Sequence, residues 1–182
     1  MKIDKALINK LQKKDRRAQL AFYKYLSPKM YGVCIRFANN RDDANDILQE
    51  GFIRVFKHIN DFRGEGSFEG WVRRTIVNTA INYYKKEKKR GYKVDLDHLT
   101  KRHVTGEIAI DKLAFDELIK IIGELPLGYR TVFNLNVIEG YTHREIGEKL
   151  EISENTSKSQ LSRAKASLVK KLETIRKREN IE

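Results

Sequence analysis

The sequence has few of the residues that interrupt helices or cross-link chains, and it lacks long apolar runs. Its 182 residues include two prolines and one cysteine, Cys34, which lies among apolar residues. A lone cysteine forms no disulfide within the chain, which fits a reducing compartment and a place in the core. No stretch approaches the ~18 consecutive apolar residues of a membrane-spanning helix, and the chain starts without an apolar signal region. We therefore expect a soluble cytoplasmic protein without a membrane span.

Motifs for catalysis and for metal or nucleotide binding are also missing. The four histidines, His58, His98, His103 and His143, form no metal-ligand set, and no HExxH sequence occurs. There is no G-x-x-x-x-G-K-[ST] loop, and the segment 64–66 (Gly-Glu-Gly) is too short to indicate phosphate cradling. We therefore predict no catalytic residue, no metal and no cofactor, and we disfavour an enzyme acting on nucleic acid.

One sign of charge dominates what is present. Lysine and arginine number 37 against 25 aspartates and glutamates, which gives a formal net charge of +12. Such an excess indicates a polyanionic partner, either nucleic acid or an acidic membrane. With 40% hydrophobic residues the chain can also bury a core, so it is not a disordered chain.

Apolar residues recur at helical spacing, and few segments alternate with period two, so the fold class is all-α. A first amphipathic helix is expected around Ile3–Leu11, and a second pattern runs to Ser27 and Pro28. The proline marks a break or the start of a new helix, which ends near Asn39 and Asn40. With the two helices that follow, these segments predict a helical N-terminal domain over residues 1–90.

The next helix has one apolar and one acidic face. Its apolar positions are Ala44, Ile47, Leu48, Phe52, Val55, Phe56 and Ile59. The other face carries Asp42, Asp43, Asp46, Gln49 and Glu50. An acidic strip in a basic protein suits a protein partner, although a solvated helix pair around an aromatic core is the plain alternative.

A second helix of this segment combines basic and amide side chains. It follows a glycine-containing loop, residues 61–66, and Ser67 is its expected N-cap. Its buried positions are expected at Trp71 or Val72, Ile76, Thr79 or Ala80, and Tyr83. Its far side aligns Arg74, Asn78, Asn82 and Lys85 before a basic run over residues 85–90. Phosphates attract lysine and arginine, and exposed bases pair with amide edges and aromatic faces, so this side suits nucleic acid.

The apolar pattern dissolves over residues 91–111, which predicts a flexible linker, and a second domain is expected over 112–182. In it, Thr142 and Glu145 form a capping box, and Ser153 caps a further helix after a short turn. The exposed start of that helix carries Lys158, Ser159, Ser162 and Arg163. This arrangement predicts a helix-turn-helix whose second helix lies in the major groove of DNA, rather than an unspecialised helical hairpin.

Three segments together resemble the extracytoplasmic-function (ECF) sigma factors of bacterial RNA polymerase. They are DDANDILQEGFIRVF, DFRGEGSFEGWVRRTIVNTAINY, and LPLGYRTVFNLNVIEGYTHREIGEKL with ISENTSKSQLSRAKASL. The resemblance covers nearly the whole chain and implies sigma domain 2, a linker and sigma domain 4. It implies a factor that directs core polymerase to specific promoters, with core RNA polymerase (the β′ coiled coil and β flap), promoter DNA and an anti-sigma factor as partners.

The resemblance also implies roles for particular residues. Matching the positions that contact the β′ coiled coil are Asp46, Gln49, Glu50 and Phe56. Assigned to the melted minus-ten strand are Phe62, Glu65, Gly66, Ser67, Phe68, Arg74, Asn78, Asn82 and Lys85. Assigned to the minus-thirty-five element are Lys158, Ser159, Ser162, Arg163 and Arg130. For Arg130 an ion pair inside the domain is an equal alternative, and Trp71 is expected mainly in the core.

Several positions depart from the family pattern. Glu151 stands at the helix-helix turn where glycine is frequent, and a left-handed conformation there costs roughly 1 kcal/mol more than with glycine. Asn155 stands where many members have glycine, and Phe52 and Arg54 differ from the commonest residues of the docking helix. A stand-alone helix-turn-helix regulator remains the alternative function, since it would need neither the acidic strip nor Asn78 and Asn82.

Overall fold

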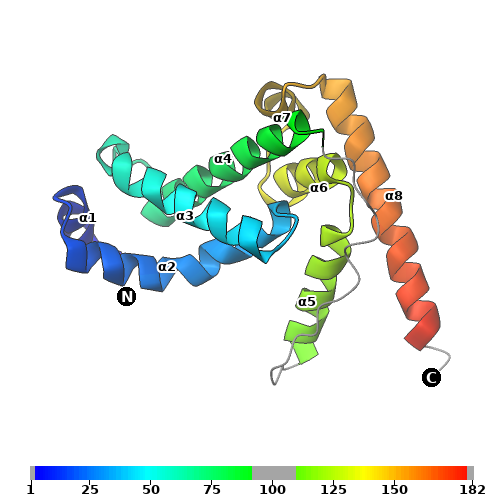
Figure 1. Cartoon of the computed structure of the whole chain (residues 1–182), viewed down its shortest axis with the longest axis horizontal. Coiled ribbons are helices and arrows are strands. Elements are labelled where there is room, and N and C mark those ends of the chain that lie inside the picture. Colours follow the sequence, from blue (N-terminus) through cyan, green and yellow to red (C-terminus); the bar gives the residue numbers. More distant parts are fainter. Residues whose placement is uncertain (1–2, 92–109, 180–182) are drawn as a thin grey trace. The chain divides into compact units, whose positions relative to one another are not determined.

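The structure is a computed structural model that describes residues 3–91 and 110–179, with side chains described for 3–91 and 117–175. All regular elements in these ranges are helices, as the sequence predicts (Figure 1). The helices group into two compact units, Met1–Tyr83 and Tyr84–Glu182. The boundaries at residues 90 and 112 remain predictions, because most of the predicted linker lies outside the described residues. Among the described helices, none has the length and apolar character that a membrane crossing requires.

Polar N-caps begin the helices of the first unit. The elements are α1 (Lys5–Gln12), α2 (Arg16–Phe37), α3 (Arg41–Lys57), a 3-10 turn (Ile59–Asp61) and α4 (Phe68–Lys89), whose residues from Tyr84 onward are grouped with the second unit. Asp4, Asp15 and Asn40 accept hydrogen bonds from first-turn amides of α1, α2 and α3. Ser67 Oγ accepts from the Gly70 amide at 3.0 Å, which confirms its predicted role at the start of α4.

The helix break predicted at Pro28 is absent, because α2 continues through it from Arg16 to Phe37. Proline removes the amide that would bond to the carbonyl four residues earlier, on Lys24. Both Pro28 and Lys24 lie on the exposed side of α2, where water can satisfy that carbonyl. The buried side, with Leu26 and Met30, keeps its packing. The proline therefore sits inside one long helix.

The core of the first unit lies between α2, α3 and α4. Its buried side chains are Phe22, Leu26, Met30, Val33, Cys34, Phe37, Ala44, Ile47, Phe52, Val55, Val72, Ile76, Val77, Ala80 and Ile81. A β-carbon on Gly51 would lie 2.3 Å from Cδ1 of Ile76, so glycine allows α3 and α4 to approach closely. Cys34 is fully buried, and burial raises the pKa of its thiol to about 12, which confirms it as a core residue.

The second unit is built around a long final helix. Its elements are α5 (Ile110–Gly123), α6 (Leu127–Phe133), a π-helical turn (Asn134–Ile138), α7 (His143–Leu150) and α8 (Glu154–Glu179). One core cluster joins α5 to α8 through Ile121, Ile122, Leu125, Ala164 and Leu168. Helices α6 and α7 also pack on α8.

Four large apolar side chains of this unit are exposed in the described residues: Leu118, Val137, Val169 and Leu172. Helical spacing from Val132 and Phe133 would turn Val137 inward, but the backbone widens into the π-helical turn after Phe133. Leu135 is fully buried in place of Val137, whose exposed fraction is 49%.

Candidate nucleic-acid and protein interfaces

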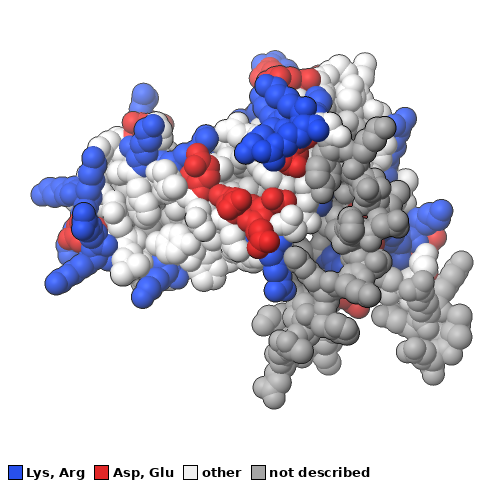
Figure 2. Space-filling model, in the orientation of Figure 1, with Lys and Arg blue, Asp and Glu red and all other residues white. Residues whose placement is uncertain are grey.

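The predicted acidic strip on α3 faces solvent (Figure 2). We name the exposed residues of this face the α3 strip: Asp42, Asp46, Gln49 and Glu50. Glu50 Oε1 accepts a hydrogen bond from Nε of Arg54 at 2.7 Å. Sequence reasoning assigned no role to Ile53, which lies one turn beyond Gln49 and is 61% exposed. The strip therefore continues into an apolar side chain, a combination suited to a protein partner.

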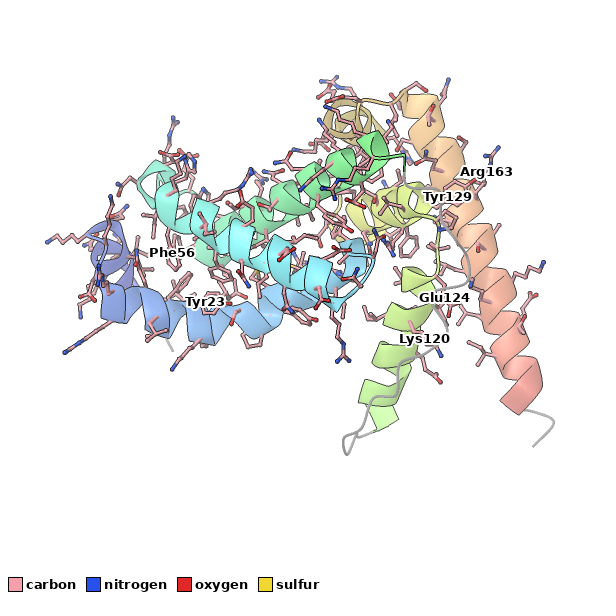
Figure 3. The ribbon with its side chains drawn as sticks, viewed as in Figure 1. Tyr23, Phe56, Lys120, Glu124, Tyr129 and Arg163 are labelled. Atoms are coloured by element: carbon pink, nitrogen blue, oxygen red, sulfur yellow. The ribbon has the colours of Figure 1, made fainter. Side chains whose placement is uncertain are left out.

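Phe56, the fourth residue predicted to bind polymerase, lies at the edge of an aromatic cluster (Figure 3). Its ring is 6.4 Å from that of Phe22 and 6.0 Å from that of Phe52, measured between centroids. The side chain is half-buried. Phe56 therefore contributes to the core with one part of its ring and leaves the other part at the surface of α3.

A second group of rings lies where the chain enters α4. We name Phe62, Phe68 and Trp71 the aromatic triad. The rings of Phe62 and Phe68 meet edge to face at 5.0 Å, and those of Phe68 and Trp71 stack at 5.7 Å. Phe68 is only 5% exposed, whereas Phe62 and Trp71 are half-buried. Phe68, predicted to bind DNA, is thus a core residue that supports the two rings open to solvent.

The loop before α4 and the outer face of α4 are exposed, as predicted. Glycines in the loop adopt left-handed conformations, with φ of +80° at Gly64 and +75° at Gly66. Exposed residues around this loop and along α4 are Glu65, Gly66, Ser67, Arg74, Asn78 and Asn82. Lys85, one turn further, is half-buried. Arginine and two amides therefore follow the triad along one helix face, which provides a cation and base-edge partners together.

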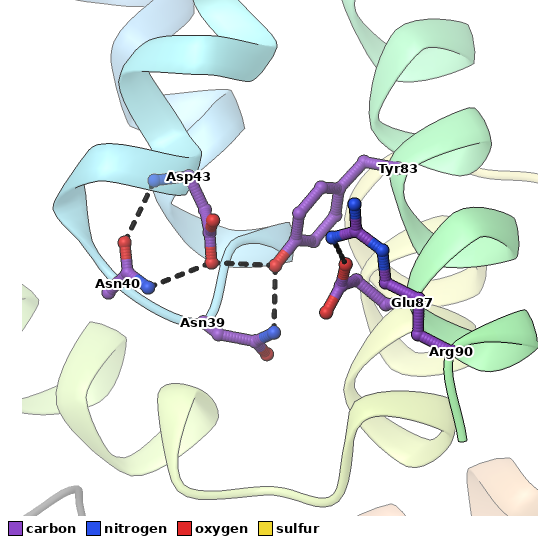
Figure 4. A network of polar contacts seen from close by, with 6 residues as sticks. All are labelled: Asn39, Asn40, Asp43, Tyr83, Glu87 and Arg90. Atoms are coloured by element: carbon purple, nitrogen blue, oxygen red, sulfur yellow. Dashed lines mark hydrogen bonds and ion pairs between the residues drawn. The ribbon is translucent and has the colours of Figure 1, made fainter. Parts of the chain in front are cut away.

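A polar network that sequence reasoning missed joins α3 to α4 (Figure 4). The hydroxyl of Tyr83 donates to Oδ2 of Asp43 at 2.8 Å and accepts from Nδ2 of Asn39 at 2.7 Å. Asn40 donates to the same Asp43 oxygen at 2.9 Å and caps α3 by accepting from the Asp43 amide. Asp43 therefore serves the fold, although the sequence placed it with the acidic strip.

Tyr83 was expected among the buried residues of α4 and is half-buried instead. Tyr84 is the buried one at 5% exposure, and burial raises the pKa of its hydroxyl. The shift by one residue places the Tyr83 hydroxyl within reach of Asp43 and Asn39. The sequence feature that could have indicated this network is the group of three polar or acidic residues close to the start of a helix: Asn39, Asn40 and Asp43.

The predicted helix-turn-helix is present as α7, a turn and α8. The capping box at its start is complete: the Thr142 amide donates to Oε2 of Glu145 at 2.8 Å, and the Glu145 amide donates to Oγ1 of Thr142 at 3.2 Å. Hydrogen bonds donated by the Thr142 amide and hydroxyl to Oε2 of Glu145 hold the pKa of that carboxyl below its usual value. Ser153 caps α8 by accepting from the Thr156 amide at 3.0 Å.

The turn between α7 and α8 is tight. Glu151 adopts the left-handed conformation that glycine favours, with φ of 56° and ψ of 52°. A β-carbon on Gly147 would lie 2.9 Å from the carbonyl oxygen of Ile152, so only glycine fits there without a shift. Nδ1 of His143 lies 2.9 Å from Oγ of the fully buried Ser157, which links the first turns of the two helices.

The four residues predicted to read DNA on α8 are all exposed on its N-terminal half: Lys158, Ser159, Ser162 and Arg163. Lys158 Nζ donates to Oε1 of Glu154 at 2.6 Å, and this bond lowers the pKa of the Glu154 carboxyl. Arg163 Nη1 donates to the hydroxyl of Tyr129 on α6 at 3.3 Å (Figure 3). The face therefore presents two cations and two hydroxyls from a rigid helix.

One assignment for this unit needs correction, and the interior position, the alternative given for Arg130, is the one observed. Arg130 is only 3% exposed and donates from Nη1 to the carbonyl of Gly123 at 2.9 Å, which places its guanidinium inside the unit and not on a DNA-facing surface. Asn155, at a position where many family members have glycine, lies inside α8. The only left-handed residues other than glycine in the described ranges are Lys14 and Glu151.

These features define a class of protein: two helical units in the described residues, with one acidic face and two faces predicted to bind nucleic acid. Family models agree with that class. Residues 22–90 match "Sigma-70 region 2" and residues 115–168 match "Sigma-70, region 4". A stand-alone helix-turn-helix regulator would contain no region 2, so that alternative is not favoured.

Curated relatives match along almost the whole chain. The RNA polymerase sigma-H factor of Pseudomonas aeruginosa is 28% identical over 184 residues, covering 94% of this chain and 95% of that protein. The ECF RNA polymerase sigma-E factor of Haemophilus influenzae is 28% identical over 189 residues, covering 94% and 96%. The sigma factor RpoE of Bartonella quintana, solved with the anti-sigma factor NepR, has the same fold, with a TM-score of 0.53 at 18% identity over 84% of this chain and 95% of that chain.

With regions 2 and 4 in order and relatives of matching length, the chain belongs to the sigma-70 family as an RNA polymerase sigma factor of the ECF type. Sigma factors are non-enzymatic proteins of transcription initiation.

Proposed function

We propose that the three exposed faces divide the work of promoter recognition. The α3 strip holds the protein on core polymerase, the aromatic triad and the outer face of α4 hold the separated minus-ten strand, and the start of α8 reads the minus-thirty-five duplex. The observation that supports this most directly is the placement of opposite charge on neighbouring helices of one unit. Acidic side chains on α3 disfavour DNA, whereas Arg74 and the amides on α4 favour it.

Docking through the α3 strip depends on exposed negative charge. Reversing it by Glu50→Lys places a cation beside Arg54 and removes the ion pair between these residues. We expect core polymerase binding to fall at least tenfold, about 1.4 kcal/mol. The matched control is Glu173→Lys, an exposed glutamate on α8 outside all three faces.

The measurement is pull-down of each purified variant with core enzyme, with circular dichroism to show that the helices are intact. Equal recovery of the Glu50→Lys and Glu173→Lys variants would place the polymerase contact elsewhere. Asp46→Lys repeats the test at a second position on the same face.

Capture of the minus-ten strand is expected to involve the exposed rings of the triad. Trp71 is the only tryptophan, so its fluorescence reports on this site in the whole protein. Binding of a single-stranded minus-ten oligonucleotide to the purified chain should change that fluorescence. Phe62→Ala should weaken binding, since stacking on an aromatic ring contributes about 1–3 kcal/mol per base. Asn82→Ala should weaken it by removing a hydrogen-bond partner for a base edge.

Duplex recognition by α8 is expected to depend on Arg163 and Lys158. Arg163→Ala should cost about 1–3 kcal/mol if the arginine pairs with a base, and it should relax specificity at one position of the minus-thirty-five element. Lys170→Gln, an exposed change on the opposite end of α8, is the control. Holoenzyme footprinting on promoter variants separates loss of specificity from uniform loss of affinity.

Tethering makes weak individual contacts sufficient. A short flexible linker raises the effective concentration of a second contact to around the millimolar range. In this arrangement the chain contributes no catalytic group, polymerase forms the bonds, and the protein acts in the cytoplasm where polymerase works. We also expect an anti-sigma factor to bind and occlude it, as NepR binds the structurally similar RpoE.

A further inference from the structure

A dense basic corner lies at the junction of α1 and α2. Residues 3–24 contain seven lysines and arginines and only two acidic residues. All seven basic side chains are exposed: Lys5, Lys10, Lys13, Lys14, Arg16, Arg17 and Lys24. Figure 2 shows basic side chains gathered over α1 and the start of α2. The five from Lys10 to Arg17, which we name the basic corner, surround the turn between the two helices.

The two acidic side chains of this segment accept hydrogen bonds from backbone amides. Asp4 accepts from the Leu7 amide at 2.9 Å, and Asp15 accepts from the amides of Arg17 and Ala18 at 2.9 and 3.0 Å. Those bonds to backbone amides hold the pKa of the Asp15 carboxyl below its usual value. Both carboxylates therefore serve as helix caps, and neither forms an ion pair with a side chain of the basic corner.

The turn places a lysine in a conformation that glycine adopts more easily. Lys14 has a φ of 59°, its amide donates to Leu11 and the Asp15 amide donates to Lys10, both at 3.0 Å. This is the Schellman pattern that ends a helix, and its left-handed position favours glycine. A strained residue that persists at a special position often has a function. Here the residue in the left-handed position is Lys14, whose cation lies among those of the basic corner.

The basic corner belongs to the same unit as the aromatic triad. Helix α1 packs on the 3-10 turn Ile59–Asp61, where Leu11 and Ile59 are buried at 0% and 1% exposure. Phe62, the first ring of the triad, follows that turn directly. Helix α1, which carries Lys10 and leads into the rest of the basic corner, is therefore packed against the turn from which the predicted DNA-binding loop departs.

We propose that the basic corner binds backbone phosphates of promoter DNA next to the strand held by the aromatic triad. The proposal rests on the proposed function of this unit and adds a further binding surface to it. Its cations carry no base-specific geometry, so the contact strengthens binding without selecting sequence. An acidic membrane is the less suitable polyanion, because Leu11 is buried and Leu7 and Ile8 are half-buried, which leaves α1 little apolar surface to insert.

The test compares holoenzymes that contain wild-type protein, Lys14→Gly, Lys13→Gln with Arg16→Gln, or the control Lys170→Gln. Each binds fork-junction DNA with a single-stranded minus-ten segment across a salt series. Loss of one contact to single-stranded phosphate should reduce the log-log salt slope by about 0.7, and loss of two by about 1.4. A slope change of 0.7 corresponds to about fivefold in affinity for each tenfold change in salt.

Lys14→Gly separates binding from folding, because glycine suits the left-handed turn. This variant should melt at the same temperature as wild type or higher while its DNA affinity falls and its salt slope flattens. Unchanged slopes for Lys14→Gly and the double variant would overturn the proposal. A second result would also overturn it: the wild-type chain binds anionic phosphatidylserine vesicles, the double variant does not, and the salt slope of the double variant on DNA equals that of wild type.

Failure of the proposed function has a different signature. If wild-type holoenzyme does not bind the fork-junction DNA at all, both the minus-ten assignment and the basic corner are wrong. If the wild-type holoenzyme binds this DNA and the variants of the basic corner bind it with the same affinity and salt slope, the minus-ten assignment stands and the assignment of the basic corner alone is wrong.

Discussion

The hydroxyl of Tyr83 on α4 donates a hydrogen bond of 2.8 Å to Oδ2 of Asp43 on α3. Asp43 lies in the first turn of the helix that carries the α3 strip. Tyr83 follows Asn82, the last amide of the face proposed to hold single-stranded DNA. This bond therefore connects the helix proposed to dock on polymerase to the helix proposed to hold DNA.

Removing that hydroxyl by Tyr83→Phe should destabilise the first unit by about 1–2 kcal/mol, because Asp43 and Asn39 both lose a partner. Chemical denaturation followed by Trp71 fluorescence measures the change within this unit. Tyr31→Phe, on α2, is the matched control and should be close to neutral. Equal stability of the two variants would show that the bond does not hold α3 and α4 together.

Gly147→Ala should destabilise the helix-turn-helix by about 1–3 kcal/mol, since the new β-carbon would lie 2.9 Å from the Ile152 carbonyl oxygen. Gly32→Ala on α2 meets no atom within 4 Å and should stabilise its helix by roughly 0.5–1 kcal/mol. Thermal unfolding followed by circular dichroism measures both. The opposite signs distinguish a steric effect from a general effect of replacing glycine.

Glu151→Gly should stabilise the turn between α7 and α8, because glycine adopts φ near 56° without strain. The relief of about 1 kcal/mol is partly offset by the greater freedom of glycine in the unfolded chain, so a net gain of roughly 0.5 kcal/mol is expected. Glu148→Gly, inside α7, should instead cost about 1 kcal/mol. A loss of stability in both variants would contradict the left-handed assignment at Glu151.

The capping box should make stability depend on pH. Its hydrogen bonds from Thr142 hold the pKa of Glu145 below the ordinary value of 4.5. A carboxyl with a lowered folded-state pKa stabilises the protein above its unfolded-state pKa, and the contribution is lost as pH falls through the folded-state pKa. Wild type should therefore melt above Glu145→Gln near neutral pH.

The gap between their melting temperatures should narrow as the pH is lowered below about 4.5. Glu173→Gln, on the exposed side of α8, corrects for the loss of one negative charge. A gap between wild type and Glu145→Gln that stays constant with pH would mean that the ionised carboxyl does not stabilise the cap.

Local features were predictable because they depend on residues close together in the chain. Ser67, Thr142 and Ser153 cap helices through amides three residues away, and short polar side chains before an apolar run are enough to indicate this. The exposed α3 strip and the four exposed residues on α8 followed from helical spacing alone.

Features that depend on packing between distant segments were not predictable. Pro28 was expected to break α2, but its position on the exposed side makes the missing bond tolerable. Phe68 and Arg130 were assigned to DNA, and neighbouring helices cover both. The sequence alone could not show which of Tyr83 and Tyr84 turns inward. Successive side chains on a helix point in directions about 100° apart, so a small rotation of the helix decides which one is buried.

The amino-acid sequence by itself determined the helical class, the acidic and basic faces and the helix-turn-helix, because periodicity and caps act over a few residues. Tertiary structure decided which polar groups support the fold and which stay exposed. It brings Asp43 within hydrogen-bonding distance of the Tyr83 hydroxyl, and it buries Arg130, which donates a hydrogen bond to the Gly123 carbonyl. A buried polar group needs a partner, and that partner can come from a segment whose place only packing establishes.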